Sequence, residues 1–178
     1  IIIPAFNAAK YISQSVKCCL HQTYTNLEIL VVNDGSTDAT RFIVERLQSL
    51  DSRIKLLNKV NGGLVSARKE ALLHVSGDFV FFLDADDVID ENTIETLAQY
   101  TKDYDVIVAD FLLENENGKV LPCQHKNNKV FGDDKIGLYS NFLSKSITAS
   151  LCGRLIRTDM LKDFSTPIHI TTGEDVIT

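Results

Sequence analysis

The sequence lacks the features that mark several common classes of protein. It has no excess of basic residues, because 18 Lys and Arg stand against 24 Asp and Glu, for a formal net charge of -6. Such a chain has no long-range attraction for nucleic acid or anionic lipid, so we expect no nucleic-acid partner and only local binding of phosphate. No apolar run approaches the ~20 residues that span a bilayer, and no signal peptide with a basic start is present.

The cysteines form no recognisable metal or redox motif. They show no CxxC spacing and no nearby pair of histidines, so the sequence indicates neither a zinc site nor a dithiol redox site. We expect free thiols in a reducing cytosol. The four positions are Cys18, Cys19, Cys123 and Cys152.

The chain also lacks an initiator Met and opens directly in the strand-like stretch IIIP. We therefore expect a fragment with residues missing at both ends. No internal repeat, low-complexity tract or linker interrupts its 178 residues, of which 44% are hydrophobic. This length and composition predict one domain over residues 1–178 with a sizeable core.

What is present is an alternation of apolar, β-branched runs with segments of helical periodicity. This order predicts an α/β fold, with a Rossmann-like, mostly parallel sheet flanked by helices on both faces. Past Leu113 the pattern loosens, and the Asn-Gly pair in ENENGKV predicts an antiparallel hairpin in the C-terminal half. Strands are predicted at 1–6, 26–34, 54–58, 78–84, 103–113 and 150–157, and helices at 11–20, 36–50, 64–75, 91–100 and 133–143.

Three of the predicted strands end with acidic or amide side chains, namely Asn7, Asp34, and Asp84 with Asp86. The carboxyl ends of parallel strands lie on one edge of a sheet, where such folds bind ligands. We therefore expect these side chains to line a single cleft.

The stretch FVFFLDADD ends a buried strand in a cluster of carboxylates that repel one another. Asp84 and Asp86 are two residues apart, so in an extended segment both would point to the same side. Mg²⁺ and Mn²⁺ prefer oxygen ligands and take one or two from protein, so this spacing predicts a sparse metal site. The alternative is that these acids only form turns or helix starts, as Asp87 and Asp90 could.

Two further segments are open to a functional and a structural interpretation. In VNDGSTD, Asp34 could accept a hydrogen bond from a base N–H, although the segment also suits a tight turn with Asp38 capping a helix. In NGGLVSARK, Arg68 could reach a diphosphate near a helix start, or it could be a solvated arginine after a turn. The second segment has neither the lysine of a P-loop nor the position of a dinucleotide fingerprint.

Near the end, GEDVIT places Glu174 beside Asp175. In an extended segment only one of them can face a given cleft. An aspartate is ionised at neutral pH and can accept a proton from an attacking alcohol. A solvated pair of loop acids is the alternative.

Taken together, these stretches resemble the family 2 glycosyltransferases, which have the GT-A fold and use nucleotide-sugar donors. IIIPAFN is similar to the opening strand of the family, and HQTYTNLEILVVNDGSTD to its second-strand signature. NGGLVSARK, GDFVFFLDADD and GED are similar to the glycine-arginine, metal-binding and catalytic-base segments. The order and spacing of the five motifs carry the resemblance, which covers about the first hundred residues and a short patch at the end.

The resemblance implies an inverting, metal-assisted transfer of a hexosyl or N-acetylhexosaminyl group from a donor such as a UDP-sugar. The implied acceptor is a saccharide or lipid-linked saccharide, as in bacterial polysaccharide biosynthesis. Residues 1–110 would bind the donor and 111–178 would begin the acceptor half. The implied location is cytoplasmic; a peripheral contact with the inner face of the cell membrane stays open, since no segment indicates one.

The same resemblance implies a role for each matching residue. Asp175 would be the catalytic base, Asp34 would read the base and Arg68 would approach the diphosphate. Asp86 would be the principal ligand of Mn²⁺ or Mg²⁺, with Asp84 at the metal or the ribose. The implied donor-binding set is Pro4, Ala5, Phe6, Asn7, Asp34, Arg68, Asp84, Ala85 and Asp86.

Two departures and three rival functions accompany this interpretation. Lys69 stands where the family often has asparagine, and the chain stops just past Asp175, before the usual acceptor loops. The rivals are a donor-binding module without turnover, a phosphatase of the haloacid dehalogenase type and a dinucleotide-binding dehydrogenase. The phosphatase would place Asp-x-Asp in its first strand, and the dehydrogenase would need glycines after its first strand, where this chain has PAFNAAK.

Overall fold

A parallel sheet of three strands organises the first part of the chain. The computed structural model describes residues 1–110, 112–114, 119–122 and 151–161. Strands β1 (Ile2–Ala5), β2 (Ile29–Asp34) and β3 (Ile54–Lys59) pair in the order β1-β2-β3, with β2 in the middle. Every residue of β2 is buried, which explains its run of β-branched residues, because a central parallel strand is covered on both faces.

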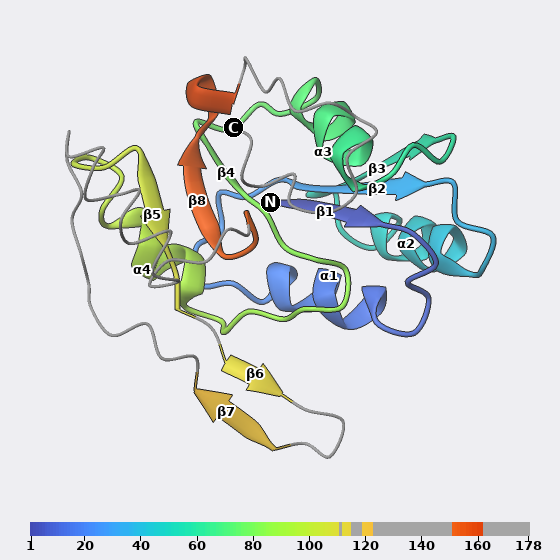
Figure 1. Ribbon diagram of the computed structural model, residues 1–178, viewed down its shortest axis with the longest axis horizontal. Helices are drawn as coiled ribbons and strands as arrows, with labels where there is room; N and C mark the ends of the chain where they lie inside the picture. Colours follow the sequence, from blue (N-terminus) through green and yellow to red (C-terminus); the bar gives the residue numbers. More distant parts are fainter. Residues whose placement is uncertain (111, 115–118, 123–150, 162–178) are drawn as a thin grey trace.

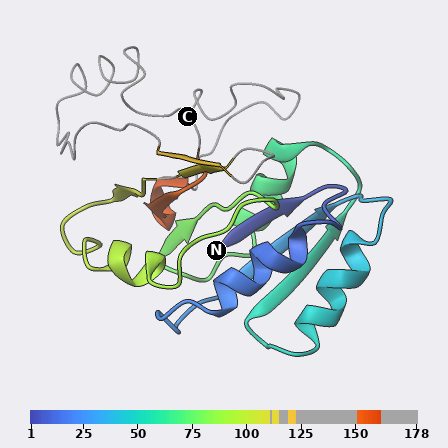
Figure 2. The same cartoon turned by 90° about the horizontal axis from the view of Figure 1, so that it is seen from below.

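Helices cover both faces of this sheet, as predicted (Figures 1 and 2). Helices α1 (Ile12–Leu20) and α2 (Thr40–Gln48) pack into one apolar cluster with β2 residues such as Val31. Helix α3 (Leu64–Leu72) packs on the opposite face, where Ala67 and Ala71 join a second cluster with β2 residues such as Leu30. The alternation of side chains along β2 therefore supplies both cores.

A second, antiparallel sheet contains β4 (Phe79–Phe81), β8 (Arg154–Arg157) and β5 (Val106–Val108), in the order β4-β8-β5. Phe82 joins the two sheets, because it forms parallel bridges with both Ile2 and Cys152. On one side Leu83 N–H donates to Ile2 C=O at 3.0 Å, and on the other Gly153 N–H donates to Phe82 C=O at 3.1 Å. The chain after β4 thus leaves the sheet beside β1.

The predicted hairpin is confirmed, but the strand predicted at 103–113 is two strands. Its first part is β5, and its second is β6 (Leu112–Glu114), which pairs antiparallel with β7 (Val120–Pro122). The two parts separate because β5 bonds to β8, whereas β6 bonds to β7 (Figure 1).

The helix predicted at 91–100 begins two residues later in the structure. Helix α4 is Thr93–Ala98 with Asn92 as its N-cap, while the backbone carbonyl of Asp90 accepts hydrogen bonds from Thr93 N–H and from Gln22 Nε2. The strand predicted at 150–157 is confirmed for its second half, since β8 is Arg154–Arg157. A 3-10 helix, η1 (Thr158–Leu161), follows β8. The helix predicted at 133–143 lies outside the described residues. Among the described residues, no helix has the length and apolar character needed to cross a membrane.

Candidate functional site

The loops after β1 and β2 are bound to each other at the carboxyl edge of the parallel sheet. Asn7 has a positive φ of 50°, and its side-chain carbonyl accepts a hydrogen bond from Thr37 N–H at 2.8 Å. Asn7 N–H donates in turn to Ser36 Oγ at 3.0 Å. Asparagine tolerates this left-handed conformation better than most residues, so the Asn7 side chain fixes the exit of β1 against the loop after β2.

Four neighbouring residues of the first strand were predicted to frame the donor. Pro4 and Ala5 are buried within β1, where they pair with β2, so they shape the sheet edge from within. Phe6 is 53% exposed and Asn7 is also exposed. Of these four, Phe6 and Asn7 are the ones whose side chains a ligand could reach.

The carboxylate of Asp34, at the end of β2, is buried among hydrogen-bond donors. Lys59 Nζ lies 2.6 Å and Gly62 N–H 3.0 Å from Oδ1, and Gly63 N–H lies 2.8 Å from Oδ2. Gly63 has a positive φ of 84°, which explains the need for glycine there. Asp34 therefore holds the glycine turn that leads into α3.

Arg68 lies on α3 and is only 1% exposed. Its side chain lies near Phe82 and Asp84, which come just after β4. Its guanidinium lies 3.6 Å from Asp84 Oδ1 and 5.6 Å from the centre of the Phe82 ring. The solvated arginine considered from the sequence is therefore wrong. The structure brings Arg68 and Asp84 together from separate motifs, with Asp84, at 39% side-chain exposure, as the accessible partner.

The acids after β4 lie on a turn, in contrast to the extended segment assumed from the sequence. Asp87 N–H donates to Asp84 C=O at 3.1 Å, which closes a turn over Ala85 and Asp86. The argument that Asp84 and Asp86 share one side of a strand therefore does not apply. Ala85 faces α1, where its carbonyl accepts a hydrogen bond from Ser15 Oγ at 2.8 Å.

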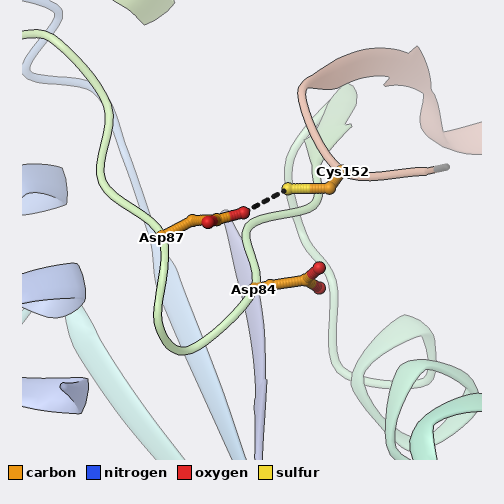
Figure 3. A group of neighbouring side chains, drawn as sticks. All are labelled: Asp84, Asp87 and Cys152. Atoms are coloured by element: carbon orange, nitrogen blue, oxygen red, sulfur yellow. Dashed lines mark hydrogen bonds between the residues drawn. The ribbon is translucent and has the colours of Figure 1, made fainter. Parts of the chain in front are cut away.

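Asp84, Asp87 and Cys152 converge at this turn (Figure 3). One ligand atom from each residue lies within 4.8 Å of the others, and Cys152 Sγ lies 3.3 Å from Asp87 Oδ2. Burial and the nearby charge of Asp84 raise the pKa of the Cys152 thiol to about 12. At neutral pH the thiol is therefore protonated and donates its hydrogen to Asp87.

Asp84 and Asp87 fit a divalent cation such as Mn²⁺ or Mg²⁺, because two convergent carboxylates supply the oxygen ligands that these ions prefer. Asp86 is exposed and does not belong to the convergent group. Its predicted role as principal ligand stays a prediction. Cys152 was not predicted, since it lies 65 residues from Asp87 and no spacing motif marks it.

The predicted base Asp175 and its neighbour Glu174 lie outside the described residues. Cys123 also lies outside them, and among the described residues Cys18, Cys19 and Cys152 form no disulfide with one another.

Two shallow surface depressions, of about 440 and 580 Å³, lie along α1 and share Cys18 and His21. No strand-end acid lines either of them. The two depressions are therefore separate from the site formed by the acids at the strand ends.

A parallel sheet whose carboxyl edge gathers acids and an arginine is the kind of site at which α/β folds bind nucleotides. Residues 1–164 match the protein family described as Glycosyl transferase family 2, and the chain belongs to this family. The fold is therefore the GT-A fold of that family, as predicted.

Two curated relatives illustrate the match. Glycosyltransferase GlyA of Streptococcus pneumoniae serotype 4 is 38% identical over 119 residues, which are 66% of this chain and 17% of that protein. The Escherichia coli UDP-Glc:alpha-D-GlcNAc-diphosphoundecaprenol beta-1,3-glucosyltransferase WfgD is 49% identical over 96 residues, which are 53% of this chain and 37% of the enzyme. The chain thus spans well under half the length of both relatives.

Among solved structures, S. aureus TarS 1-349 in complex with UDP is similar to this chain with a TM-score of 0.76 and 29% sequence identity. The match covers 98% of this chain and 51% of the TarS chain. The family match over residues 1–164 favours the glycosyltransferase interpretation over the phosphatase and dehydrogenase alternatives.

Proposed function

We propose that this chain binds a nucleotide-diphosphate sugar, with UDP as the nucleotide, and transfers the sugar to an acceptor hydroxyl with inversion. The observation that carries the proposal is the meeting of Arg68 with Asp84 beside the convergent acids after β4. An arginine beside a group of carboxylates suits a diphosphate that is bound together with a cation. The UDP complex of TarS supports the choice of nucleotide, since that protein shares the fold.

We propose Asp84 and Asp86 as the metal ligands, with Asp87 as a further carboxylate at the same turn. A bound divalent cation would supply charge stabilisation for the departing diphosphate. The positive charge of Arg68 acts in the same sense, because preorganised charge stabilises the leaving group without reorganisation. Phe6 and Asn7 are proposed to border the donor, while Pro4 and Ala5 hold the strand beneath it.

The proposed chemical step is a single displacement. The acceptor oxygen forms a bond to the anomeric carbon while the bond from that carbon to the diphosphate oxygen breaks. The diphosphate leaves with the electron pair, and Asp175 takes the proton of the acceptor hydroxyl, a contribution of roughly 10²–10⁴-fold. Asp175→Asn should abolish transfer and leave UDP binding intact. Equal loss of transfer and binding would contradict this role.

We further propose a saccharide or lipid-linked saccharide as the acceptor, in polysaccharide biosynthesis at the cytoplasmic face of a membrane. The name of the E. coli relative describes transfer onto a sugar diphosphoundecaprenol, which supports an acceptor of that class. The transferred group would be a hexose or an N-acetylhexosamine.

Thermal melting of the chain with UDP tests donor binding directly. With Mn²⁺ present, a hundredfold excess of UDP over its Kd should stabilise the native state by ~2.7 kcal/mol and raise the melting temperature. EDTA should remove the shift, and so should Asp84→Asn. The matched control is Asp103→Asn, which changes an exposed acid between α4 and β5 and should keep the shift.

Two outcomes would count against the proposal. A shift with UDP that survives EDTA and Asp84→Asn would rule out the metal and the acids after β4. No shift with UDP or any other nucleotide diphosphate would rule out donor binding by this chain.

A further inference from the structure

Asp34, the acid at the end of β2, is partly covered by the side chain of Lys59. Asp34 is 4% exposed at its side chain, whereas Lys59, which pairs with it at 2.6 Å, is 17% exposed. Lys59 comes from the last position of β3, which pairs with Asp34 across the sheet. A ligand that arrives at this edge therefore meets the ammonium group before most of the carboxylate.

The ammonium group of Lys59 is held in place and retains a donor for a ligand. Within the part of the chain that the structure describes, it donates to Asp34 Oδ1 and to Val60 C=O, at 2.6 and 2.7 Å. An ammonium group carries three N–H donors, so one remains. A Cβ at Gly62 would lie 2.9 Å from Lys59 Nζ and 2.6 Å from Ser66 Oγ, so the absence of a side chain there leaves room for the lysine.

Asp34 keeps limited acceptor capacity beside this donor. Its Oδ1 accepts from Lys59 and Gly62, while Oδ2 accepts from Gly63 at 2.8 Å and more distantly from Gly62 at 3.2 Å. The single Gly62 N–H is thus shared between the two oxygens and lies nearer Oδ1, so Gly63 is the one full donor to Oδ2. Because a carboxylate oxygen has two lone pairs, Oδ2 can take one further donor. The pair thus offers an N–H donor next to a carboxylate acceptor.

We propose that Lys59 is a specificity-determining residue that, together with Asp34, selects a base carrying a carbonyl next to a ring N–H. This inference rests on the proposed function, since it assigns the base of the donor nucleotide. Uracil presents such an edge, with its carbonyl toward Lys59 and its imide N–H toward Asp34. Cytosine presents an amino group and an unprotonated ring nitrogen at the same positions, so donor would face donor and acceptor would face acceptor. Such unpaired polar groups are what produces discrimination.

UDP and CDP are the sharpest probes, because they differ only at this edge of the base. We expect the native chain with Mn²⁺ to bind UDP about tenfold more tightly than CDP in a calorimetric titration. Lys59→Met should reduce this ratio to about threefold or less, mainly through weaker UDP binding. Pyrophosphate, which has no base, should bind the native chain and the variant equally.

The matched control is Lys55→Met, which changes an exposed lysine on the same strand that pairs with Glu28 at 2.8 Å. This variant should keep the native affinities for all three ligands. Lys59→Met leaves the buried Asp34 without its ion pair, so Lys59→Gln, which retains a neutral donor, is measured beside it. If Lys59→Met fails to fold, the ratio is read from Lys59→Gln, for which a decrease is also expected.

Three results separate the possibilities. Equal affinity of the native chain for UDP and CDP would overturn the inference and leave donor binding standing. Loss of UDP, CDP and pyrophosphate binding by the same factor in Lys59→Met would also overturn it, because Lys59 would then act on the diphosphate. If the native chain binds neither UDP nor pyrophosphate, the proposed function itself fails.

Discussion

The segments after β2 and after β4 both place aspartates at the end of a buried strand, yet they differ in what satisfies those acids. Asp34 is buried, and its two oxygens accept hydrogen bonds from Lys59, Gly62 and Gly63. Asp84 and Asp87 are more exposed and converge with Cys152. The protein supplies most of the hydrogen bonds to Asp34, which keeps capacity for one further donor, whereas the second group offers more exposed oxygens to an incoming ligand. The same sequence signal can therefore mark an acid that mainly anchors a loop or an acid that is mainly open to a ligand.

The largest expected effect comes from removing the anchored acid. Asp34→Ala leaves the Lys59 ammonium and two amides without their acceptor, so the free energy of unfolding should fall by about 3 kcal/mol. Urea denaturation measures the loss. Asp84→Asn, which keeps an oxygen toward Arg68, should cost less than half as much. If both variants lose the same stability, the contrast between the two segments is wrong.

The next effect concerns the second metal ligand beside Asp84. The sequence favours Asp86 for this role, whereas the geometry favours Asp87. Mn²⁺ affinity, followed by the paramagnetic resonance of the free ion in the presence of UDP, should fall at least about tenfold in Asp84→Asn. If Asp86 is the second ligand, the Mn²⁺ affinity should fall by a similar factor in Asp86→Asn and by less in Asp87→Asn. The opposite ranking would assign the second carboxylate to Asp87. Unchanged affinity in all three variants would remove the metal site from this turn.

The smallest effect concerns Glu28, which lies just before the first residue of β2. Its carboxylate also accepts hydrogen bonds from the protein, from Lys55 and Ser76. Burial raises its pKa, but hydrogen bonds from Lys55 and from Ser76 N–H outweigh burial and lower it to about 2. Because the folded-state pKa lies below the usual 4.5, Glu28 stabilises the fold above that pH, and this contribution is lost as the pH falls toward 2.

Denaturation at several pH values checks this prediction. Glu28→Gln should lower stability at pH 7 and flatten its decrease between about pH 4.5 and 2. The matched control is Glu45→Gln, which changes an exposed helix ion pair with Arg41 and should leave the acid slope unchanged. An acid slope that is the same in Glu28→Gln and in the native chain would contradict the assignment.

Local patterns in the sequence predicted much of the fold but less of the site. The order of the first elements follows from periodicity, and the β6-β7 hairpin follows from Asn-Gly. The burial of Arg68 could not be predicted, because it depends on Phe82 and Asp84 from a distant segment. The approach of Cys152 likewise depends on the bridge between Phe82 and Cys152, which no local spacing encodes. The turn at 84–87 is closed by a local hydrogen bond, and the sequence indicated a turn there only as the alternative to a metal site.

Because Phe82 bridges the two sheets, its position fixes the strand register of the residues that follow. Phe82 belongs to the apolar cluster under α3, while Leu83 belongs to the cluster under α1 and α2. Deleting one residue between Phe82 and Asp84 would shift the acids along the strand and exchange which side of the sheet they leave from. Natural insertions and engineered tags should therefore be tolerated far better in the loop between α4 and β5 than within these three positions.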